Sequence, residues 1–229
     1  MVIEILEDAD AVAKRAANLI AATARQCVGE RNRFVFAVSG GRTPWKMLRI
    51  LAAEDVPWEH VHVVQVDERL APNGHSDRNL THLRESLLPH APLSPDHIYP
   101  MPVGEADLTK AASSYAHLLE DLAGSPPVLD LIHLGLGADG HTASLVPGDP
   151  ALEVHDREVA VTEVYQGRRR MTLTYPALNR ARQLLWLVTG ADKAEMLPRL
   201  RDGDEGIPAG RVASGNAMVI ADRSAAERL

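Results

Sequence analysis

The sequence has one cysteine, few aromatic residues and no long apolar run, and each scarcity excludes something. A single cysteine, Cys27, rules out an intrachain disulfide and a zinc site built on cysteine. Its alanine-rich helical surroundings favour a small buried apolar residue over a reactive thiol. Aromatic residues make up 4% of the chain, so the core has to be mainly aliphatic. No apolar run approaches the roughly 20 residues that span a membrane.

An excess of positive charge is also missing. The chain has 24 Lys and Arg against 31 Asp and Glu, a formal net charge of −7, whereas nucleic-acid binders usually present a basic face. The acidic start of the chain, residues 1–10, lacks the basic segment of a signal peptide. We therefore predict a cytoplasmic protein with a small-molecule ligand, no nucleic-acid partner and no membrane contact. At this length a monomer is expected.

Short apolar runs alternate with helical patterns along the chain. The patterns predict strands at 34–38, 61–66, 128–134, 159–164, 171–175, 183–189 and 217–221, and helices at 8–28, 44–54, 77–88, 107–122 and 191–201. This alternation predicts an α/β fold, a mostly parallel open sheet with helices on both faces. We expect residues 1–229 to form it as a single domain.

Local signals refine these boundaries. Gly29 is expected to end the first helix, and Pro198 to end or kink the last one. The proline-rich segment 89–102 is interpreted as a connection over the surface. The two strands of 159–164 and 171–175 are expected to form a hairpin that turns near residues 166–167.

Polar or glycine-rich segments directly follow three of the predicted strands. They are Ser39–Pro44, Asp67–Arg69 and Gly135–Pro147. Ligands of open α/β sheets bind beyond the carboxyl ends of the strands. We therefore expect all three segments to meet at one edge of the sheet.

The first of these segments joins a strand to a helix. Gly40 and Gly41 permit a sharp turn that points backbone N–H groups outward. Thr43 can cap the helix, and Pro44 suits its first position. Because a helix N-terminus with free amides binds anions, the candidate phosphate ligands are Ser39, Gly40, Gly41, Arg42 and Thr43. The alternative is an ordinary tight turn with a capped helix; the Walker A pattern is absent.

The second segment places charges at a strand end, where they are costly unless a site or solvent uses them. Asp67 could orient a histidine or sugar hydroxyls, and Arg69 could hold a phosphate through its forked guanidinium. The alternative for residues 67–69 is a surface ion-pair cluster. Arg170 and Lys193 lie beside other predicted strands, where they either reach the same sheet edge to bind phosphate or carboxylate, or remain solvated.

The third segment, Gly135–His141, contains a formal G-x-G-x-x-G. Such a motif binds a dinucleotide when it opens the first βα unit and leads into a full helix. Here it lies past mid-chain, and Pro147-Gly148 cuts the following segment short. We interpret it instead as a loop that presents His141 beside Asp139, since a histidine pKa of roughly 6.5 suits a general base.

Other chemistries find less support in the sequence. The chain has no G-x-S-x-G elbow and no activated cysteine, which leaves a water molecule, activated by a histidine, as the nucleophile. His60 and His62 could share a strand face and bind a metal ion. A third ligand is missing, so we predict no metal site.

Taken together, these segments resemble the 6-phosphogluconolactonase family. The matching stretches, in the family's order, are Ser39-Gly-Gly-Arg-Thr-Pro44, Val66-Asp-Glu-Arg69, Gly135-Leu-Gly-Ala-Asp-Gly-His-Thr-Ala-Ser-Leu145, Arg170-Met-Thr-Leu-Thr174 and Thr189-Gly-Ala-Asp-Lys193. Two departures are Val146, where the family usually has Phe, and Gly210, where another small residue is common. Neither removes a chemical group, so we expect altered packing and unaltered chemistry.

The resemblance implies hydrolysis of 6-phospho-D-glucono-1,5-lactone to 6-phosphogluconate, the second step of the oxidative pentose phosphate pathway, without a cofactor. It implies that His141 is the general base. For the phosphate it implies Arg69, Arg170 and Lys193 together with the Ser39–Thr43 loop. We expect Asp67 or Asp139 to orient the water or the imidazole, with their separate roles left open.

Two alternatives belong to other functions. A glucosamine-6-phosphate deaminase would share the fold, the Ser-Gly-Gly loop and the Asp-Gly-His motif. That family expects a carboxylate after the histidine motif, where this chain has Leu145-Val-Pro147, and an aromatic residue where it has Arg69. A non-catalytic sugar-phosphate-binding domain would normally lack His141 and adjoin a DNA-binding module.

Overall fold

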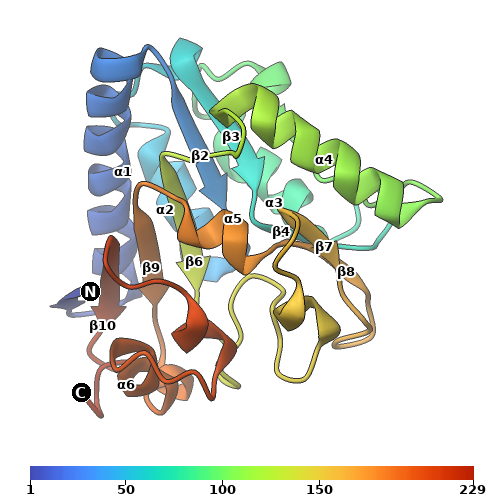
Figure 1. The fold of residues 1–229 in the computed structure, drawn as a ribbon. Helices are drawn as coiled ribbons and strands as arrows, with labels where there is room; N and C mark the ends of the chain where they lie inside the picture. Colours follow the sequence, from blue (N-terminus) through green and yellow to red (C-terminus); the bar gives the residue numbers. More distant parts are fainter.

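Seven parallel strands form the main sheet, in the order β1-β10-β9-β6-β2-β3-β5 (Figure 1). The computed structural model describes all residues from 1 to 229. The strands are β1 Val2–Leu6, β2 Phe34–Val38, β3 Val61–Gln65, β5 Ile98–Tyr99, β6 Leu131–Gly135, β9 Leu184–Val188 and β10 Ala217–Asp222. Strands β2 and β9 are buried along their whole length, as expected for continuous apolar runs in a sheet covered on both faces.

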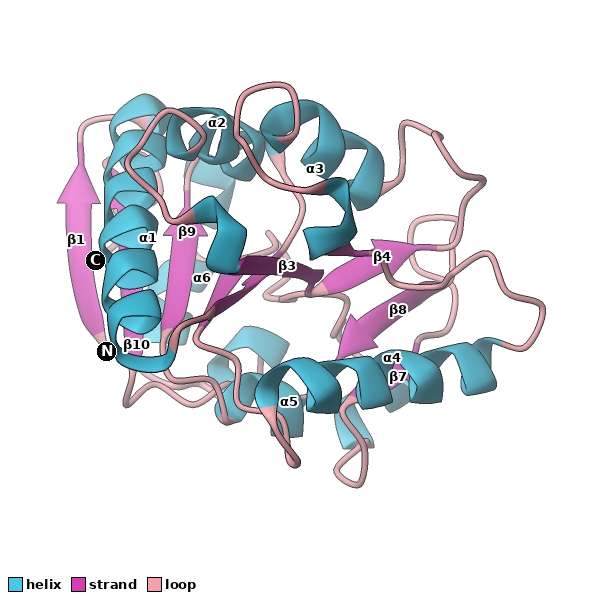
Figure 2. Cartoon of the chain, turned by 90° about the horizontal axis from the view of Figure 1, so that it is seen from above, coloured by secondary structure: helices cyan, strands magenta, loops and turns pink.

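Helices cover both faces of this sheet. Figure 2 shows α1 Ala9–Arg31, α2 Arg42–Leu51 and α3 Asn79–Leu87 on one side, and α4 Leu108–Ala123 and α5 Tyr175–Asn179 on the other. The last helix is α6 Met196–Arg201, and short 3-10 turns lie at Trp58–His60, Pro95–His97, Pro150–Glu153, Ala191–Lys193 and Pro208–Arg211. The prediction of a mostly parallel α/β fold with helices on both faces is confirmed. None of these helices combines the length and the apolar character needed to cross a membrane.

Two hydrophobic cores fill the spaces between helices and sheet. One joins the buried alanines of α1 to Leu48 of α2 and Leu83 of α3. The other joins Leu119 of α4 and Leu197 of α6 to Trp186 of β9. The small side chains on α1 let that helix lie close to the sheet and to α2, which suits a chain with few aromatic residues.

A second, antiparallel sheet lies beyond the end of β3. Its strands are β4 Asp67–Arg69, β8 Arg170–Leu173 and β7 Val159–Val161, in the order β4-β8-β7. The hairpin expected from 159–164 and 171–175 is confirmed, and its turn has positive φ at Gln166 (51°) and Gly167 (81°). The pairing of Asp67–Arg69 with this hairpin was not predicted (Figure 2).

The strand order fixes where a ligand can bind. From β2 the chain adds β3 and then β5 on one side, and from β6 it adds β9 and β10 on the other. The order therefore reverses between the neighbours β2 and β6. In open α/β sheets, the crevice at this switch point, outside the carboxyl ends of the strands, is the usual ligand site.

Several local expectations were wrong. Helix α1 continues through Gly29 to Arg31 and ends at Asn32, whose left-handed backbone (φ 58°) lets its N–H reach Val28 O at 2.8 Å. A glycine inside a helix costs only about 1 kcal/mol relative to alanine, so it need not end the helix. The helix expected at 191–201 is divided into the 3-10 turn Ala191–Lys193 and α6, and Pro198, expected to end or kink it, is the third residue of α6. A proline is tolerated there because first-turn amides have no intrahelical partner to lose.

Edge elements account for most of what the patterns missed. The patterns mark the start of the chain only as an acidic segment and predict no strand there; in β1, two of the five side chains, Val2 and Ile5, are exposed. Strand β5 is two residues long and lies inside the proline-rich segment 89–102, which is therefore more than a surface connection. Both are too short or too mixed for a periodic signal.

Candidate active site

A polar cleft of about 180 Å³ opens at the switch point between β2 and β6. The structure brings to it eight of the residues predicted for the site, namely Ser39, Gly40, Gly41, Asp67, Arg69, His141, Arg170 and Lys193. Its other lining residues are Asn79, Gly135, Leu136, Gly137 and Ala143. Arg42 and Thr43 line an adjoining hollow that shares Gly40, Gly41 and Lys193 with the cleft. Asp139 does not line the cleft and instead bonds His141.

His141 is held by its neighbour Asp139. The Asp139 Oδ1 atom lies 2.6 Å from His141 Nδ1 and also accepts the backbone N–H of His141 at 3.2 Å. Burial raises the pKa of Asp139, but the charge and hydrogen bonds of His141 and the hydroxyl of Tyr165 hold it below its ordinary value. An ionised carboxylate only accepts, so Nδ1 carries the proton and Nε2 of a neutral imidazole is left as a base.

Gly137 makes room for this pair. A Cβ at position 137 would overlap Nδ1 of His141 and come within 2.6 Å of Oδ1 of Asp139. Gly137, in the glycine-rich loop after β6, therefore allows the His141 imidazole to pack against the backbone. Residues 142–149 form turns and no helix. The glycine motif therefore lacks the following helix that a dinucleotide-binding site has.

Asp67 has a different set of partners. Its Oδ1 accepts from Ser39 Oγ at 3.2 Å and its Oδ2 from Ser144 Oγ at 2.7 Å, and its side chain is almost fully buried. Asn79 Nδ2 donates to the Asp67 carbonyl at 3.0 Å. Asp67 thus ties together the segments that follow β2 and β6, while Asp139 bonds the imidazole. The geometry separates two carboxylates whose roles the sequence left open.

The turn after β2 rests on a buried histidine. Ser39 N–H donates to Nδ1 of His133 at 3.2 Å, and complete burial lowers the pKa of His133 to about 3. His133 is therefore neutral and accepts the hydrogen bond. Gly40 packs so closely on Asn79 that a Cβ there would overlap its side-chain oxygen. Both contacts fix the backbone that leads into α2.

Helix α2 starts earlier than its proline suggested. Gly41, with φ 136°, is the N-cap, Arg42 is the first helical residue and Pro44 the third. No side chain caps the helix; Thr43 Oγ1 instead pairs with Thr189 Oγ1 at 2.8 Å, so the expected Thr43 cap is wrong. The uncapped first-turn amides leave an anion-binding helix end beside the cleft.

Three basic side chains line the cleft. Arg69 donates to the carbonyl of Asp77 at 2.9 Å, and Lys193 pairs with Asp192 at 2.8 Å. Arg170 is buried, and its Nε has no hydrogen-bond partner. Burial lowers the pKa of Arg170, an effect that the charge of Asp67 partly offsets. An unpartnered donor on a buried cation is costly and favours an anionic ligand.

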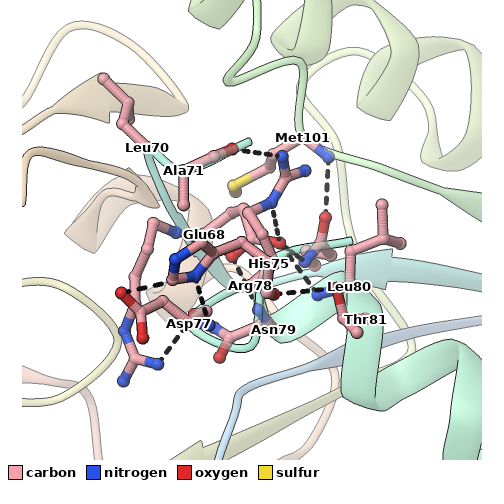
Figure 3. Close-up of polar contacts among 12 residues, drawn as sticks. Glu68, Leu70, Ala71, His75, Asp77, Arg78, Asn79, Leu80, Thr81 and Met101 are labelled. Atoms are coloured by element: carbon pink, nitrogen blue, oxygen red, sulfur yellow. Dashed lines mark hydrogen bonds and ion pairs between the residues drawn. The ribbon is translucent and has the colours of Figure 1, made fainter. Parts of the chain in front are cut away.

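Glu68, the middle residue of β4, anchors that strand to the start of α3 (Figure 3). It is fully buried and accepts the backbone N–H groups of Asn79 at 2.8 Å and Leu80 at 2.9 Å, at the start of α3. Arg78 Nε lies 3.0 Å from Oε2 as an ion pair outside hydrogen-bond geometry. The surface ion-pair alternative for residues 67–69 is therefore wrong.

Sequence reasoning missed Asn79 and Tyr165. Asn79 contacts Gly40 and Asp67 from the start of α3. Tyr165 lies at the end of the β7–β8 hairpin and bonds Asp139. Neither follows a strand of the main sheet, so the strand-end rule did not select them. The hairpin prediction was the available signal for Tyr165, because it brings the turn near Arg170.

The His60 and His62 pair does not form a metal site. His62 Nδ1 pairs with the Tyr99 hydroxyl at 2.9 Å, and its ring packs on His97. The structure contains no group of three or more His, Cys, Asp or Glu side chains arranged to hold a metal ion. The cleft lining includes three basic side chains and one carboxylate, that of Asp67, and its basic groups suit an anion.

The fold and the cleft define a doubly wound α/β protein with a polar cleft at its switch point, the usual place of a ligand site in such folds. The chain belongs to the family described as glucosamine-6-phosphate isomerases/6-phosphogluconolactonase, whose model matches residues 7–221. A 6-phosphogluconolactonase of Synechocystis is 38% identical over 199 residues, which cover 85% of this chain and 82% of that protein.

Solved structures agree with this membership. The 6-phosphogluconolactonase of Trypanosoma brucei has a TM-score of 0.89 at 25% identity, covering 100% of this chain and 98% of that one. A monomeric glucosamine-6-phosphate deaminase has a TM-score of 0.86 at 19% identity, covering the whole of both chains. The second likeness shows the shared fold alone.

Proposed function

We propose that the protein hydrolyses 6-phospho-D-glucono-1,5-lactone to 6-phospho-D-gluconate in the oxidative pentose phosphate pathway. The observation that carries this proposal is His141, whose Nδ1 is held by Asp139 at the edge of a cleft lined by basic side chains. A base beside an anion site suits hydrolysis of an ester that carries a phosphate. The relative from Synechocystis, named a 6-phosphogluconolactonase, supports the same reaction.

The substrate phosphate binds first. In the proposal, Arg69, Arg170 and Lys193 hold it together with the amides at the start of α2. The free Nε of Arg170 gains a partner when the anion arrives, and charge-assisted bonds of this kind are strong. Anchoring the phosphate places the lactone ring toward His141 and supplies the positioning part of the catalysis.

Hydrolysis then proceeds in two steps. Nε2 of His141 takes a proton from water as the water oxygen attacks the lactone carbonyl carbon C1. The tetrahedral oxyanion is stabilised by loop amides and nearby cations. It collapses with cleavage of the bond between C1 and the ring oxygen, and the imidazolium returns its proton to that oxygen. Asp139 orients the imidazole throughout, while Asp67 keeps the two loops in place.

The test compares wild type with His141→Ala on lactone made fresh from glucose 6-phosphate, with the spontaneous rate subtracted. The variant should lose about 100-fold or more in kcat with little change in KM, because a general base contributes roughly 10²–10⁴-fold. His117→Ala, an exposed histidine on α4, is the matched control and should retain full activity. A wild-type rate equal to the spontaneous one would refute the lactonase proposal, and ammonia release from glucosamine 6-phosphate would be measured next.

The proposal treats residues 1–229 as one catalytic unit, since the cleft draws on positions from 39 to 193. The monomeric state and the cytoplasmic location stay predictions. Gel filtration with light scattering measures the first, and fractionation of the source cells the second.

A further inference from the structure

The end of the β7–β8 hairpin reaches the histidine site through Tyr165. Its backbone pairs with Arg168, N–H to O at 3.0 Å and 3.3 Å, across the two-residue turn of Gln166 and Gly167. Two-residue turns with positive φ at both positions match the twist of a hairpin and fix its register. The tyrosine is therefore presented from a defined backbone position.

The Tyr165 hydroxyl completes a chain of hydrogen bonds to the imidazole. It donates to Oδ2 of Asp139 at 2.8 Å, while Oδ1 of the same carboxylate lies 2.6 Å from Nδ1 of His141. Burial and the nearby Asp139 carboxylate raise the pKa of Tyr165, so the phenol stays protonated and donates. The Asp139 side chain is 38% exposed, and without the Tyr165 bond only its Oδ1 atom would be held, by His141 itself.

The Tyr165 ring makes two further contacts. It packs edge-to-face with the His141 ring, with centroids 5.6 Å apart, and the Arg170 guanidinium carbon lies 4.9 Å from its centroid. Gln166 Oε1 also accepts from Arg170 at 3.3 Å. A guanidinium over an aromatic face is held by cation–π attraction. One side chain thus contacts both the proposed base and a proposed phosphate ligand.

We propose that Tyr165 is a positioning residue of this site, whose hydroxyl locks the Asp139–His141 pair and whose ring holds Arg170. This inference rests on the proposed function, since it concerns the same base and the same phosphate ligand. The hydroxyl acts on turnover, because it holds the Asp139 carboxylate as the acceptor of the Nδ1 proton of His141 and leaves Nε2 as the base. The ring acts on substrate binding, because it restrains the guanidinium.

The two parts of the side chain can be separated by substitution. Tyr165→Phe keeps the ring and should lower kcat about tenfold, the size of one lost hydrogen bond to a charged group, with KM unchanged. Tyr165→Leu should lower kcat equally and also raise KM several-fold. Tyr99→Phe is the matched control, since its hydroxyl bonds a histidine that does not line the cleft, His62, and it should leave both constants unchanged.

Coupling to Asp139 tests whether Tyr165 acts through that residue. In an Asp139→Asn background, Tyr165→Phe should have little further effect on kcat, because the pair it stabilises is already broken. Equal effects of Tyr165→Phe in both backgrounds, or no effect in either, would overturn the inference while leaving the lactonase activity of the wild type intact.

The tautomer of His141 can be measured without substrate, so this test does not depend on the proposed lactonase activity. Nitrogen-15 NMR of the histidines distinguishes the two imidazole tautomers, and the spectrum of His141→Ala assigns the His141 signals. Wild type should show the proton on Nδ1, and Tyr165→Phe should show averaging toward the other tautomer. An unchanged His141 signal in Tyr165→Phe overturns the positioning role, whatever the lactone assay gives.

Discussion

The two sheets contribute to the cleft in different ways. The segments that follow strands of the parallel sheet supply backbone groups, from the turn after β2 and the glycine loop after β6, together with the side chains of His141 and Lys193. The antiparallel sheet supplies side chains, because Asp67, Arg69 and Arg170 all lie on its strands β4 and β8. The parallel sheet thus forms the edge of the cleft and supplies one of its three basic side chains, whereas the small antiparallel sheet supplies the other two and the buried carboxylate of Asp67.

The largest effect on stability is expected at Glu68, which anchors the antiparallel sheet to α3. Glu68→Leu should lower the free energy of unfolding by about 3–5 kcal/mol, since it leaves Arg78 buried without its anion and the first amides of α3 without an acceptor. Urea unfolding measures this. Glu68→Gln, which keeps one acceptor oxygen, should cost less and provides a folded variant for kinetics.

An exposed ion pair is the control for this prediction. Glu153 pairs with Arg211 at 3.1 Å, and its side chain is 70% exposed. Glu153→Leu should change stability by less than about 1 kcal/mol. If both leucine variants lose similar stability, burial is not what makes the Glu68 anchor important.

The next effect concerns the glycine loop of the parallel sheet. Gly137→Ala should lower kcat about 100-fold while changing the melting temperature little, because the new methyl group displaces His141 and Asp139 from each other. Gly104→Ala is the control, as a Cβ at that exposed position outside the cleft has open space. A fully active Gly137→Ala would show that the observed contact between imidazole and carboxylate is unnecessary.

Acidification should weaken the turn after β2. The pKa of buried His133 is lowered to about 3, so the unfolded chain, with a value of roughly 6.5, binds one more proton between these pH values. Stability is therefore full above about pH 6.5 and falls by about 1.4 kcal/mol per pH unit below it. Urea unfolding of wild type and His133→Gln from pH 7 to pH 5 measures the slope, which should be shallower in the variant.

The smallest effect is expected at Thr43, where a substitution tests whether the side chain or the backbone amides at the start of α2 bind the phosphate. Thr43→Val removes the hydrogen bond to Thr189 and should cost about 1 kcal/mol of stability. KM should change less than about twofold, because in the proposal the amides bind the phosphate. A clearly larger KM increase would assign phosphate binding to the Thr43 hydroxyl and contradict the role proposed for the amides.

The parts of the site that follow strands of the parallel sheet could be located from the sequence. Continuous apolar runs such as 34–38 marked buried strands, and the polar residues after them had to lie at the carboxyl edge. The meeting of the Ser39 and His141 segments follows from that rule. Asn79 and Tyr165 were not found by that rule, since Asn79 lines the cleft from the start of α3 and Tyr165 contacts Asp139 and His141 from a hairpin.

By itself, the sequence determined the α/β class, the main strands and helices, and the residues that carry charge and a titratable ring, because these follow from local periodicity and side-chain chemistry. Only the tertiary structure decided that Asp139 and not Asp67 holds His141, that Glu68 is a buried anchor, and that Gly137 makes room for the imidazole. These are contacts between atoms whose geometry depends on sheet pairing, such as that of Asp67 with Thr172. Spacing along the chain does not encode such distances.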